Sequence, residues 1–387
     1  MLKIAFDAKR AFQNMTGLGN YSRFVIESLA DTFPENQYVL MAPKVCDNPR
    51  IRPVLDRPNI STVAPEGFFA RHFRSHWRTY SISRLCDSLD VNLYHGLSNE
   101  IPVAGPNRKY ASVVTVHDLI WRRFPSDYTA IDRKIYDRKY RRSAETADRI
   151  IAISERTRDD LVADWNIDPT KIDVIYQGCH ESFRQPVSPD LIKEVIHKYG
   201  LPEKFIISVG TVQGRKNQLL AIKSLRHIGN DVKLVIVGND KSDYANGLKK
   251  FIKDNGLENR VVWMSFVPFS ELPALYAAAT ISSYTSFYEG FGIPLVESLG
   301  CGTPVIACTG SCLEEAGGPG AFYVAPDDVE GYVRSANAIL NDSDLRRRLV
   351  AEGRQYIRRF DPSGFADKIM DTYLKAINRR RERAGKA

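Results

Sequence analysis

The chain has 387 residues, of which 43% are hydrophobic and 26% are charged. This composition is ordinary for a globular protein, and the length predicts two domains whose cores need no disulfides or structural metal. It excludes a disordered chain, a collagen-like repeat and a small disulfide-rich scaffold.

The chain is basic, with 54 Lys and Arg against 46 Asp and Glu and a net charge of +8. A basic excess is compatible with a nucleic acid, an anionic membrane or a phosphorylated substrate, and composition does not choose among them. The six cysteines include no Cys-x-x-Cys pair, so we expect reduced thiols and no zinc site. We find no membrane-spanning stretch and no signal-peptide pattern, and we therefore expect a cytoplasmic protein.

Short β-branched apolar runs alternate with helical patterns along the whole chain, which predicts parallel sheets with helices on both faces. The predicted strands of the first half are Lys3–Asp7, Tyr38–Ala42, Val91–His95, Ser112–His117, Arg149–Ser154 and Ile172–Tyr176. Those of the second half are Phe205–Gly210, Lys233–Gly238, Val261–Ser265, Ile281–Tyr284, Thr303–Ala307 and Ala321–Val324. The main predicted helices are Asn20–Phe33, Asp132–Ala147, Gln218–His227, Tyr244–Asp254, Glu271–Ala278, Ser343–Phe360 and roughly Gly364–Arg383.

This alternation occurs twice, with a polar, proline-bearing stretch (Gln185–Pro202) between the two halves. We therefore predict an α/β protein with two Rossmann-like, doubly wound domains that face a cleft, formed by residues 1–185 and 186–363. A C-terminal helix in residues 364–387 follows, and the N-terminal domain is one candidate for its packing partner. Ligands of open α/β sheets bind at the carboxyl ends of the strands, so the cleft is the expected site.

The strongest motif is Glu-Gly-Phe-Gly-Ile-Pro, which begins at Glu289. Gly290 and Gly292 form a loop that enters a helix at Pro294, and a helix N-terminus presents free N–H groups to an anion. Glu297 follows Glu289 by eight positions, and carboxylates accept hydrogen bonds from sugar hydroxyls. The motif predicts a site for a phosphate and a sugar. The alternative is a solvated loop with a helix-capping glutamate.

A second motif places Arg215 and Lys216 in the loop after the predicted strand Phe205–Gly210. Two cations at the carboxyl end of a strand can neutralise a diphosphate and the charge of a diphosphate leaving group. Solvated Arg-Lys pairs are common on protein surfaces, so this motif alone does not indicate a phosphate site. Together with the glutamate motif it does.

The two motifs together resemble the retaining nucleotide-sugar glycosyltransferases of family 4, which have the two-domain GT-B fold, and the resemblance covers nearly the whole chain. Their Glu-x7-Glu signature is matched by Glu289 and Glu297. The resemblance implies that Glu297 binds the donor ribose and that Lys216 is the phosphate lysine, with Glu289 and Lys216 at the catalytic centre. It implies that the transferred sugar and the diphosphate are held by Glu289 and the loop backbone of Gly290, Phe291, Gly292 and Ile293.

One position departs from the family pattern. The family often has a Gly-Arg pair at the end of the first strand of its second domain, whereas this chain has Gly210 and Thr211. One phosphate-binding arginine therefore lacks a counterpart, and Arg215 is the candidate substitute.

The first half agrees with the resemblance. Gly17 and Gly19 follow the first strand and open a helix, similar to the N-terminal glycine loop of the family, with a plain tight turn as the alternative. The third glycine of a dinucleotide fingerprint is missing, which argues against such a site. His117 ends a predicted strand and looks like the active-site histidine that contacts the donor sugar. A structural histidine is the alternative.

Two further segments have competing interpretations. The basic aromatic segment Phe68–Arg78 predicts either a helix on an anionic membrane or a helix with core aromatics and solvated arginines. Asp342 and Asp344 match the Asp-x-Asp string that holds a metal in other glycosyltransferases. Because they precede a helical pattern, we predict instead that Asp342 or Ser343 is the N-cap and Asp344 a first-turn acid.

The sequence thus predicts a cytoplasmic enzyme, with possible peripheral contact at the inner membrane face. It would move a sugar from a nucleoside-diphosphate donor to a saccharide or lipid-linked acceptor with retention and with no metal or cofactor. GDP-mannose is the donor we favour, because such segments resemble bacterial mannosyltransferases, and a UDP-sugar is the alternative. A GT-B phosphorylase or epimerase remains open. A non-enzymatic nucleic-acid-binding protein would explain the charge, but the sequence contains none of the recognised motifs.

Overall fold

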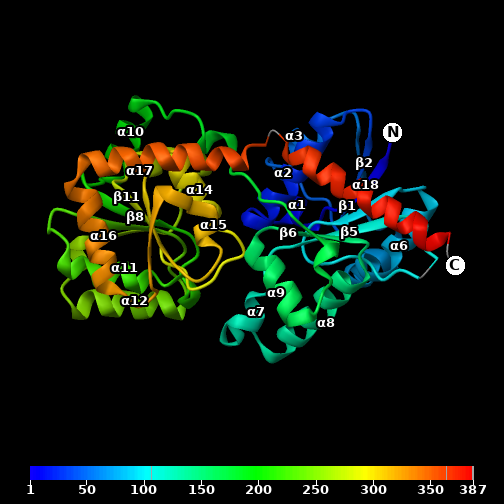
Figure 1. The fold of residues 1–387 in the computed structure, drawn as a ribbon, viewed down its shortest axis with the longest axis horizontal. Coiled ribbons are helices and arrows are strands. Elements are labelled where there is room, and N and C mark those ends of the chain that lie inside the picture. Colours follow the sequence, from blue (N-terminus) through cyan, green and yellow to red (C-terminus); the bar gives the residue numbers. More distant parts are fainter. Residues whose placement is uncertain (106, 363, 386–387) are drawn as a thin grey trace. The chain divides into compact units, whose positions relative to one another are not determined.

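The computed structural model describes residues 1–105, 107–362 and 364–385, with only the backbone described for residues 69–71 and 384. The chain divides into two compact units. Unit 1 comprises Met1–Gln177 and Pro362–Ala387, and unit 2 comprises Gly178–Asp361. Each unit has one parallel sheet covered by helices on both faces (Figure 1), which confirms the two predicted Rossmann-like domains.

Across the described residues, the sheet of unit 1 has seven strands in the order β3-β2-β1-β4-β5-β6-β7. They are β1 (Lys3–Asp7), β2 (Gln37–Met41), β3 (Ile60–Val63), β4 (Leu93–Gly96), β5 (Ala111–Val116), β6 (Arg149–Ala152) and β7 (Ile172–Val174). The sheet of unit 2 has six, in the order β10-β9-β8-β11-β12-β13. They are β8 (Phe205–Val209), β9 (Lys233–Val237), β10 (Val261–Met264), β11 (Ile281–Tyr284), β12 (Val305–Cys308) and β13 (Ala321–Val324).

Both sheets reverse their strand order beside their first strand, between β1 and β4 in unit 1 and between β8 and β11 in unit 2. Loops leave such a switch point in opposite directions, so the carboxyl ends of the two strands border a crevice in which ligands of α/β proteins bind. The fold therefore singles out one ligand-binding edge in each unit.

All twelve predicted strands are present, with ends within two residues of the prediction. The sequence analysis missed β3, in which Ile60 and Val63 are only partly buried and Ser61 and Thr62 are exposed. β3 lies at the edge of its sheet and pairs with β2 alone. An edge strand needs little apolar surface, so its sequence signal is weak.

Two helices of unit 1 begin at residues whose side chains cap them. Thr129 caps α8 and Ser154 caps α9 through hydrogen bonds from backbone N–H groups of the first turn. Asn166 ends α9 in the left-handed conformation that favours Asn and Gly. The helices are α1 (Lys9–Gln13), α2 (Gly17–Thr32), α3 (Arg52–Leu55), α4 (Gly67–His72), α5 (Arg74–His76), α6 (Ile82–Ser88), α7 (Ile120–Arg123), α8 (Ala130–Thr146), α9 (Glu155–Trp165) and α18 (Phe365–Ala384).

Several helices of unit 2 also begin with a side-chain cap. Ser188, Ser242 and Asp328 cap α10, α12 and α16 through their side chains, and Gly200 ends α10 in the left-handed conformation. The helices are α10 (Pro189–Tyr199), α11 (Gln218–Ser224), α12 (Asp243–Asp254), α13 (Leu272–Ala278), α14 (Ile293–Gly300), α15 (Leu313–Gly317), α16 (Val329–Asn341) and α17 (Ser343–Tyr356).

The C-terminal helix α18 belongs to unit 1, where it packs against α2, β5 and β6. The chain enters unit 2 at Gly178, whereas the sequence analysis placed the boundary after residue 185, and it leaves at Asp361 rather than at residue 363. The earlier entry follows from Phe183, which is fully buried and packs edge-on against Phe269 and Tyr276 of unit 2. Burial of this ring ties the preceding residues to unit 2.

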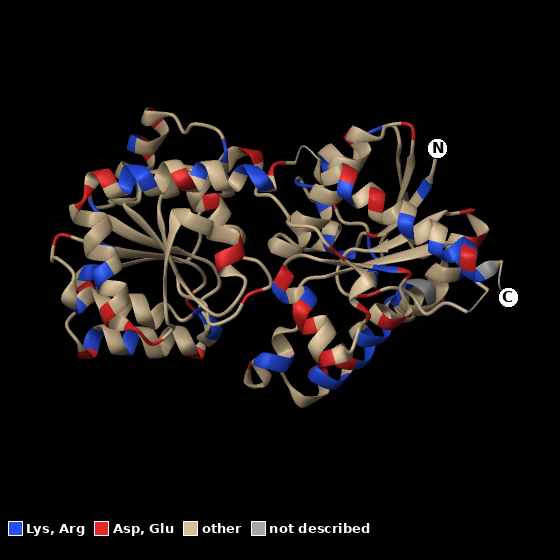
Figure 2. Cartoon of the chain, viewed as in Figure 1, with Lys and Arg blue, Asp and Glu red and all other residues tan. Residues whose placement is uncertain are grey.

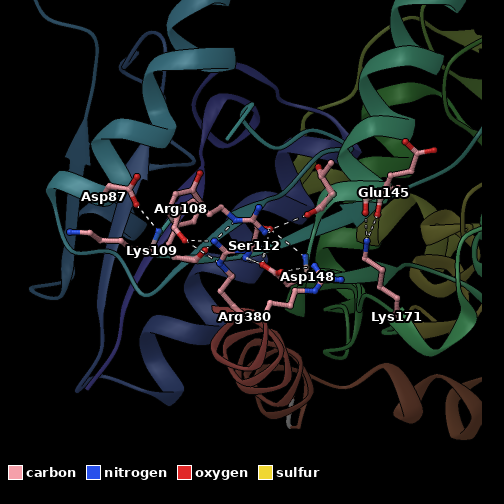
Figure 3. Close-up of polar contacts among 12 residues, drawn as sticks. Asp87, Arg108, Lys109, Ser112, Glu145, Asp148, Lys171 and Arg380 are labelled. Atoms are coloured by element: carbon pink, nitrogen blue, oxygen red, sulfur yellow. Dashed lines mark hydrogen bonds and ion pairs between the residues drawn. The ribbon is translucent and has the colours of Figure 1, made fainter. Parts of the chain in front are cut away.

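A buried polar network lies at the amino ends of β5 and β6 (Figure 3). The carboxylate of Asp148, which is fully buried, accepts hydrogen bonds from Arg108 (2.7 Å) and from the backbone N–H of Ser112 (2.8 Å). Arg383 of α18 lies 3.5 Å from the same carboxylate, and Arg380 donates to the carbonyl of Arg108. These contacts attach α18 to the sheet of unit 1.

Candidate functional site

The switch point of unit 2 brings together three residues that the sequence analysis singled out. Arg215 and Lys216 lie in a 3-10 turn after β8, and Glu289 lies in the loop after β11. Lys216 Nζ is 2.6 Å and Arg215 Nη1 is 2.7 Å from the same oxygen of Glu289, Oε1. One carboxylate thus binds two cations at the edge of the sheet where ligands bind.

This cluster is largely shielded from water, since its three side chains are only 9–13% exposed. Burial alone would raise the pKa of Glu289, but the charges of Lys216 and then Arg215 outweigh it, and the pKa is lowered. Burial lowers the pKa of Lys216, and the carboxylate of Glu289 offsets part of this effect. Glu289 is therefore ionised at neutral pH.

Two residues of this cluster escaped the sequence analysis. Tyr284, the last residue of β11, accepts a hydrogen bond from Lys216 Nζ (2.7 Å), and its ring centre lies 4.9 Å from the same nitrogen. The sulfur of Cys312 lies within hydrogen-bond distance of the carbonyl oxygens of Glu289 (3.1 Å) and Phe291 (2.9 Å), which share its single proton, and so it fixes the loop. The end of a strand could have pointed to Tyr284, whereas nothing in the sequence connects Cys312 to the motif.

The glycine loop and the helix start have the predicted form. Gly292 has φ of +122°, and a Cβ there would lie 3.0 Å from Leu313, so the position requires glycine. α14 begins at Ile293 with Pro294 in its first turn, as predicted. The ring of Phe291 is buried edge-on against Phe360, so its backbone alone is available to a ligand.

Glu297 lies on α14 and is partly buried. The hydroxyl of Tyr276 donates to its Oε2 over 3.4 Å, and burial raises the pKa of Glu297 to about 7. Within the described residues, no hydrogen bond or ion pair joins Glu297 to Glu289 or Lys216. The Glu-x7-Glu pair is thus two chemically different carboxyl groups. Glu289 is ionised and ion-paired, whereas the pKa of Glu297 lies near neutral pH.

Arg215 stands in a different place from the arginine that the family pattern puts at Thr211. Its Nη1 donates to the carbonyl of Tyr288 (2.6 Å) as well as to Glu289, and its own carbonyl accepts from the N–H of Phe287 (2.9 Å). Arg215 therefore joins the two loops of the switch point, and Thr211 is exposed.

His117 follows β5 in unit 1 and is buried. Its Nε2 lies 2.9 Å from the carbonyl of Leu97, and because a carbonyl oxygen only accepts, the proton is on Nε2. Tyr21 packs edge-on against the ring, and burial lowers the pKa of His117 to about 4. His117 is therefore a neutral imidazole whose Nδ1 can accept a hydrogen bond.

The glycine loop of unit 1 has a clear packing requirement at one position. A Cβ at Gly19 would lie 1.8 Å from the carbonyl oxygen of Asn14, whereas nothing lies within 4 Å of such an atom at Gly17. Gly19 is needed for α2 to start against the preceding loop. Gly17, the first residue of α2, is exposed.

The structure decides part of the interpretation of the segment Phe68–Arg78. In Phe68–Arg78 the rings of Phe68 and Phe73 are exposed and Trp77 is buried, and the side chain of Arg71 lies outside the described atoms. Arg78 forms ion pairs with Asp7 and Glu100, so the prediction of uniformly solvated arginines is wrong at this position.

The Asp-x-Asp string is part of a helix start. Asp342 accepts hydrogen bonds from the N–H groups of Asp344 and Leu345 as the N-cap of α17, and Asp344 lies in the first turn, as predicted. In the described ranges, no group of three or more His, Cys, Asp or Glu side chains is placed to hold a metal ion. The same ranges contain no helix that is both long and apolar enough to cross a bilayer.

Two family models match the chain in succession. Glycosyltransferase Family 4 matches residues 18–183 and Glycosyl transferases group 1 matches residues 192–356. HepE of Anabaena, solved with UDP, has a TM-score of 0.75 at 18% identity, with coverage of 96% of this chain and 99% of that one. The lipopolysaccharide glycosyltransferase WaaG has a TM-score of 0.69 at 16% identity, with coverage of 96% and 99%.

Curated relatives agree with these matches. The O-antigen chain mannosyltransferase B of Escherichia coli is 26% identical over 286 residues, which are 73% of this chain and 74% of that protein. The O-antigen chain mannosyltransferase RfbU of Salmonella typhimurium is 29% identical over 249 residues, which are 64% and 65%.

Fold and matches together define a glycosyltransferase of the GT-B fold. The chain belongs to the family 4 glycosyltransferases and is similar to bacterial mannosyltransferases. This assignment replaces the nucleic-acid-binding alternative.

Proposed function

We propose that the protein transfers mannose from GDP-mannose to a hydroxyl group of a saccharide or lipid-linked saccharide, with retention of configuration. The observation that carries the proposal is the cluster of Arg215, Lys216 and Glu289 at the switch point of unit 2. Mannosyltransferases among the relatives favour mannose. A UDP-sugar is the second candidate donor, because the similar protein HepE was solved with UDP.

In this proposal Lys216 and the N-terminus of α14 neutralise the donor diphosphate, and their charge counts most as the diphosphate leaves. The bond from the anomeric carbon to the phosphate oxygen breaks, and the acceptor oxygen bonds to the same face of that carbon. The acceptor proton passes to the leaving phosphate oxygen. Glu289, ionised and bound by two cations, is available neither as an acid nor as an unencumbered nucleophile.

The remaining site residues bind and orient the donor. Glu297 accepts hydrogen bonds from the ribose hydroxyls, while Glu289 and the backbone of Gly290–Gly292 contact the transferred sugar. His117, held neutral by burial, accepts a hydrogen bond from the sugar through Nδ1. Each assignment follows the family resemblance and agrees with the charge state of the residue.

A thermal-shift screen of GDP-, UDP- and ADP-sugars tests the donor. A donor at about 100 times its Kd stabilises the protein by about 2.7 kcal/mol and raises Tm. We expect GDP-mannose to raise Tm of the native protein, to act weakly on Lys216→Ala, and to act fully on Lys223→Ala, an exposed lysine of α11. Absence of stabilisation by every sugar nucleotide would contradict the proposal.

Donor turnover separates the GT-B alternatives. A transferase consumes donor only with an acceptor, an epimerase consumes it alone, and a phosphorylase requires inorganic phosphate. The anomeric configuration of the product, read by NMR, decides between retention and inversion.

The two glutamates are expected to differ in kinetics. Glu297→Ala raises KM for the donor, because a ribose contact is equally strong in the ground and transition states. Glu289→Gln mainly lowers kcat, because the transferred sugar changes shape and charge. Identical kinetic profiles would refute this division of roles.

A further inference from the structure

One face of the sheet of unit 1 carries a row of buried polar side chains beside His117. Thr115 in β5 and His117 just after it are two positions apart, so their side chains point to the same side of the sheet. His95 in β4 lies on this side as well, because it contacts Thr115. All three residues are at most 5% exposed.

Four buried side chains on this face are joined by hydrogen bonds. The hydroxyl of Tyr373 lies 2.6 Å from His95 Nδ1, and His95 Nε2 lies 2.8 Å from Thr115 Oγ1. The hydroxyl of Tyr21 lies 3.0 Å from the same Oγ1. This tyrosine–histidine network runs from Tyr373 on α18 through β4 and β5 to Tyr21 on α2.

The charge state of His95 couples the two halves of the tyrosine–histidine network. His95 is neutral, since burial lowers its pKa to about 3. A neutral imidazole has one N–H and one acceptor nitrogen, so the ring donates one of its two hydrogen bonds and accepts the other. The direction of the bond at one nitrogen therefore fixes the direction at the other, and each bond strengthens its neighbour. Loss of a hydroxyl at one end should affect the whole network.

Tyr373 belongs to an uncharged stripe of α18. It shares this stripe with Ile369 and Ile377, which are also buried, while Lys and Arg occupy other positions of the helix (Figure 2). Burying the hydroxyl of a tyrosine costs free energy unless it is hydrogen-bonded, and His95 supplies that bond. The stripe therefore brings α18 into polar contact with the side of the sheet on which His117 lies.

The other end of the network contacts His117 directly. The ring of Tyr21 packs edge-on against the imidazole, with the ring centres 4.7 Å apart and the ring planes at 86°. Among the described residues, the imidazole has a single hydrogen-bond partner, the carbonyl of Leu97. One hydrogen bond does not fix the tilt of a ring, so the packing of Tyr21 limits how the imidazole of His117 can tilt.

We propose that Tyr21, His95 and Tyr373 are positioning residues for His117. The network holds the hydroxyl of Tyr21, the ring of Tyr21 holds the tilt of His117, and this tilt decides where Nδ1 of His117 points. The inference rests on the proposed function, in which that nitrogen accepts a hydrogen bond from the donor sugar. It adds that α18, at the far end of the sequence, takes part in holding this histidine.

Variants that remove one hydroxyl and keep the ring test the network. Tyr21→Phe should lower kcat about tenfold and Tyr373→Phe about threefold, with KM for the donor changed less than about twofold, because a misdirected group costs most where the sugar changes shape. The double variant should lose no more than Tyr21→Phe alone, since both substitutions break one network. Losses that simply multiply in the double variant would contradict the coupling.

Thr115 offers a conservative pair of variants. Thr115→Val removes the hydroxyl and nearly keeps the shape of the side chain, whereas Thr115→Ser keeps the hydroxyl. We expect Thr115→Val to lose kcat about tenfold, as Tyr21→Phe does, and Thr115→Ser to keep at least about half of the native kcat. Equal losses in the two variants would show that the shape of the side chain matters and the hydrogen bond does not.

The matched control is Tyr38→Phe. Tyr38 is another fully buried tyrosine of unit 1, and its hydroxyl lies within hydrogen-bond distance of the carbonyls of Leu29 (2.8 Å) and Phe33 (3.1 Å), outside the network. This variant should lower Tm about as much as Tyr373→Phe and leave kcat unchanged. An equal loss of kcat in the control would overturn the proposal, because it would show that kcat follows stability alone.

A readout independent of activity is the ring N–H of His117. Its hydrogen bond to Leu97 is buried, so this proton should exchange slowly with water and be visible by NMR in protein labelled with ¹⁵N-histidine. Tyr21→Phe and Tyr373→Phe should speed the exchange severalfold, and Tyr38→Phe should not. Unchanged exchange in the first two variants would refute the network.

The two hypotheses fail separately. Native protein that turns over the donor, with the same kcat in Tyr21→Phe and Tyr373→Phe, refutes the network and keeps the proposed function. If those variants speed the exchange at His117 in a protein that turns over no sugar nucleotide, the proposed function is refuted and the hold of the network on His117 stands.

Discussion

The switch points of the two units share a strand order and differ in chemistry. In unit 2 the edge carries a carboxylate between two cations, at 2.6 Å and 2.7 Å. In unit 1 it carries a cation between two carboxylates, since Arg78 pairs with Asp7 at the end of β1 and with Glu100 after β4. Two histidines that burial keeps neutral lie beside it: His95 in β4, hydrogen-bonded to Tyr373 and Thr115, and His117 after β5, hydrogen-bonded to Leu97. The fold therefore determines where a ligand-binding edge lies, and the loop residues determine which ligand it suits.

A second set of buried charges in unit 1 lies at the other edge of the sheet and has a structural role. Asp148 and Arg108 lie at the amino ends of β5 and β6, at the opposite end of β5 from His117, and attach the helix α18. In unit 2 the buried charges lie at the carboxyl ends. Substitutions of Asp148 or Arg108 should change stability, and substitutions of the buried charges of unit 2 should change donor chemistry.

The largest effect is expected for Asp148→Ala. Removing this carboxylate leaves Arg108 buried without its partner, and breaking a buried ion pair costs about 3–5 kcal/mol of unfolding free energy. Urea unfolding measures the loss. The control is Asp47→Ala, which breaks an exposed pair with Arg52 and should have little effect. If the two variants are equally stable, the network of Figure 3 does not stabilise unit 1.

Next in size is Lys216→Ala, which should lower kcat/KM for donor turnover by ~10²–10³, or ~3–4 kcal/mol, because a preorganised charge meets the leaving diphosphate. Arg215→Ala should lose less turnover and more stability, because Arg215 joins the two loops. Steady-state kinetics and unfolding of the same preparations give both values. If Lys216→Ala turned over the donor like the native protein, Lys216 would not be a phosphate-binding residue.

A smaller effect concerns Glu297 and pH. Its pKa is about 7 in the folded protein and lower in the unfolded chain, so the folded state binds the proton more tightly. Stability should therefore fall as pH rises from about 4.5 to 7, by on the order of 1–3 kcal/mol. Glu297→Gln cannot titrate, so its Tm should exceed that of the native protein at pH 8 and not at pH 5. Parallel Tm profiles for both proteins would show that Glu297 titrates normally.

The smallest effect is expected at the Asp-x-Asp string. Asp342→Ala removes the N-cap of α17 and should cost about 1 kcal/mol of stability without lowering turnover. Because Lys216 and the start of α14 provide the positive charge, we also expect full activity in excess EDTA. Loss of activity in EDTA with rescue by magnesium or manganese would overturn the metal-free mechanism and reopen the assignment of Asp342.

The sequence by itself determined the local structure. Strand periodicity placed the twelve predicted strands, Pro294 placed the start of α14, and Asp342 marked the start of α17. These features depend on residues within a few positions of one another, so a single sequence contains the whole signal.

Only the tertiary structure decided which distant residues meet. The 3-10 turn after β8 and the loop after β11 converge because β8 and β11 are neighbours in the sheet, and this brings Lys216 to Glu289 and Tyr284. The same holds for His95 and Tyr373, which are 278 positions apart, and for Phe183, whose burial sets the boundary of unit 2. Such contacts depend on strand order and on the packing of whole faces, and neither is encoded in any short stretch of the chain.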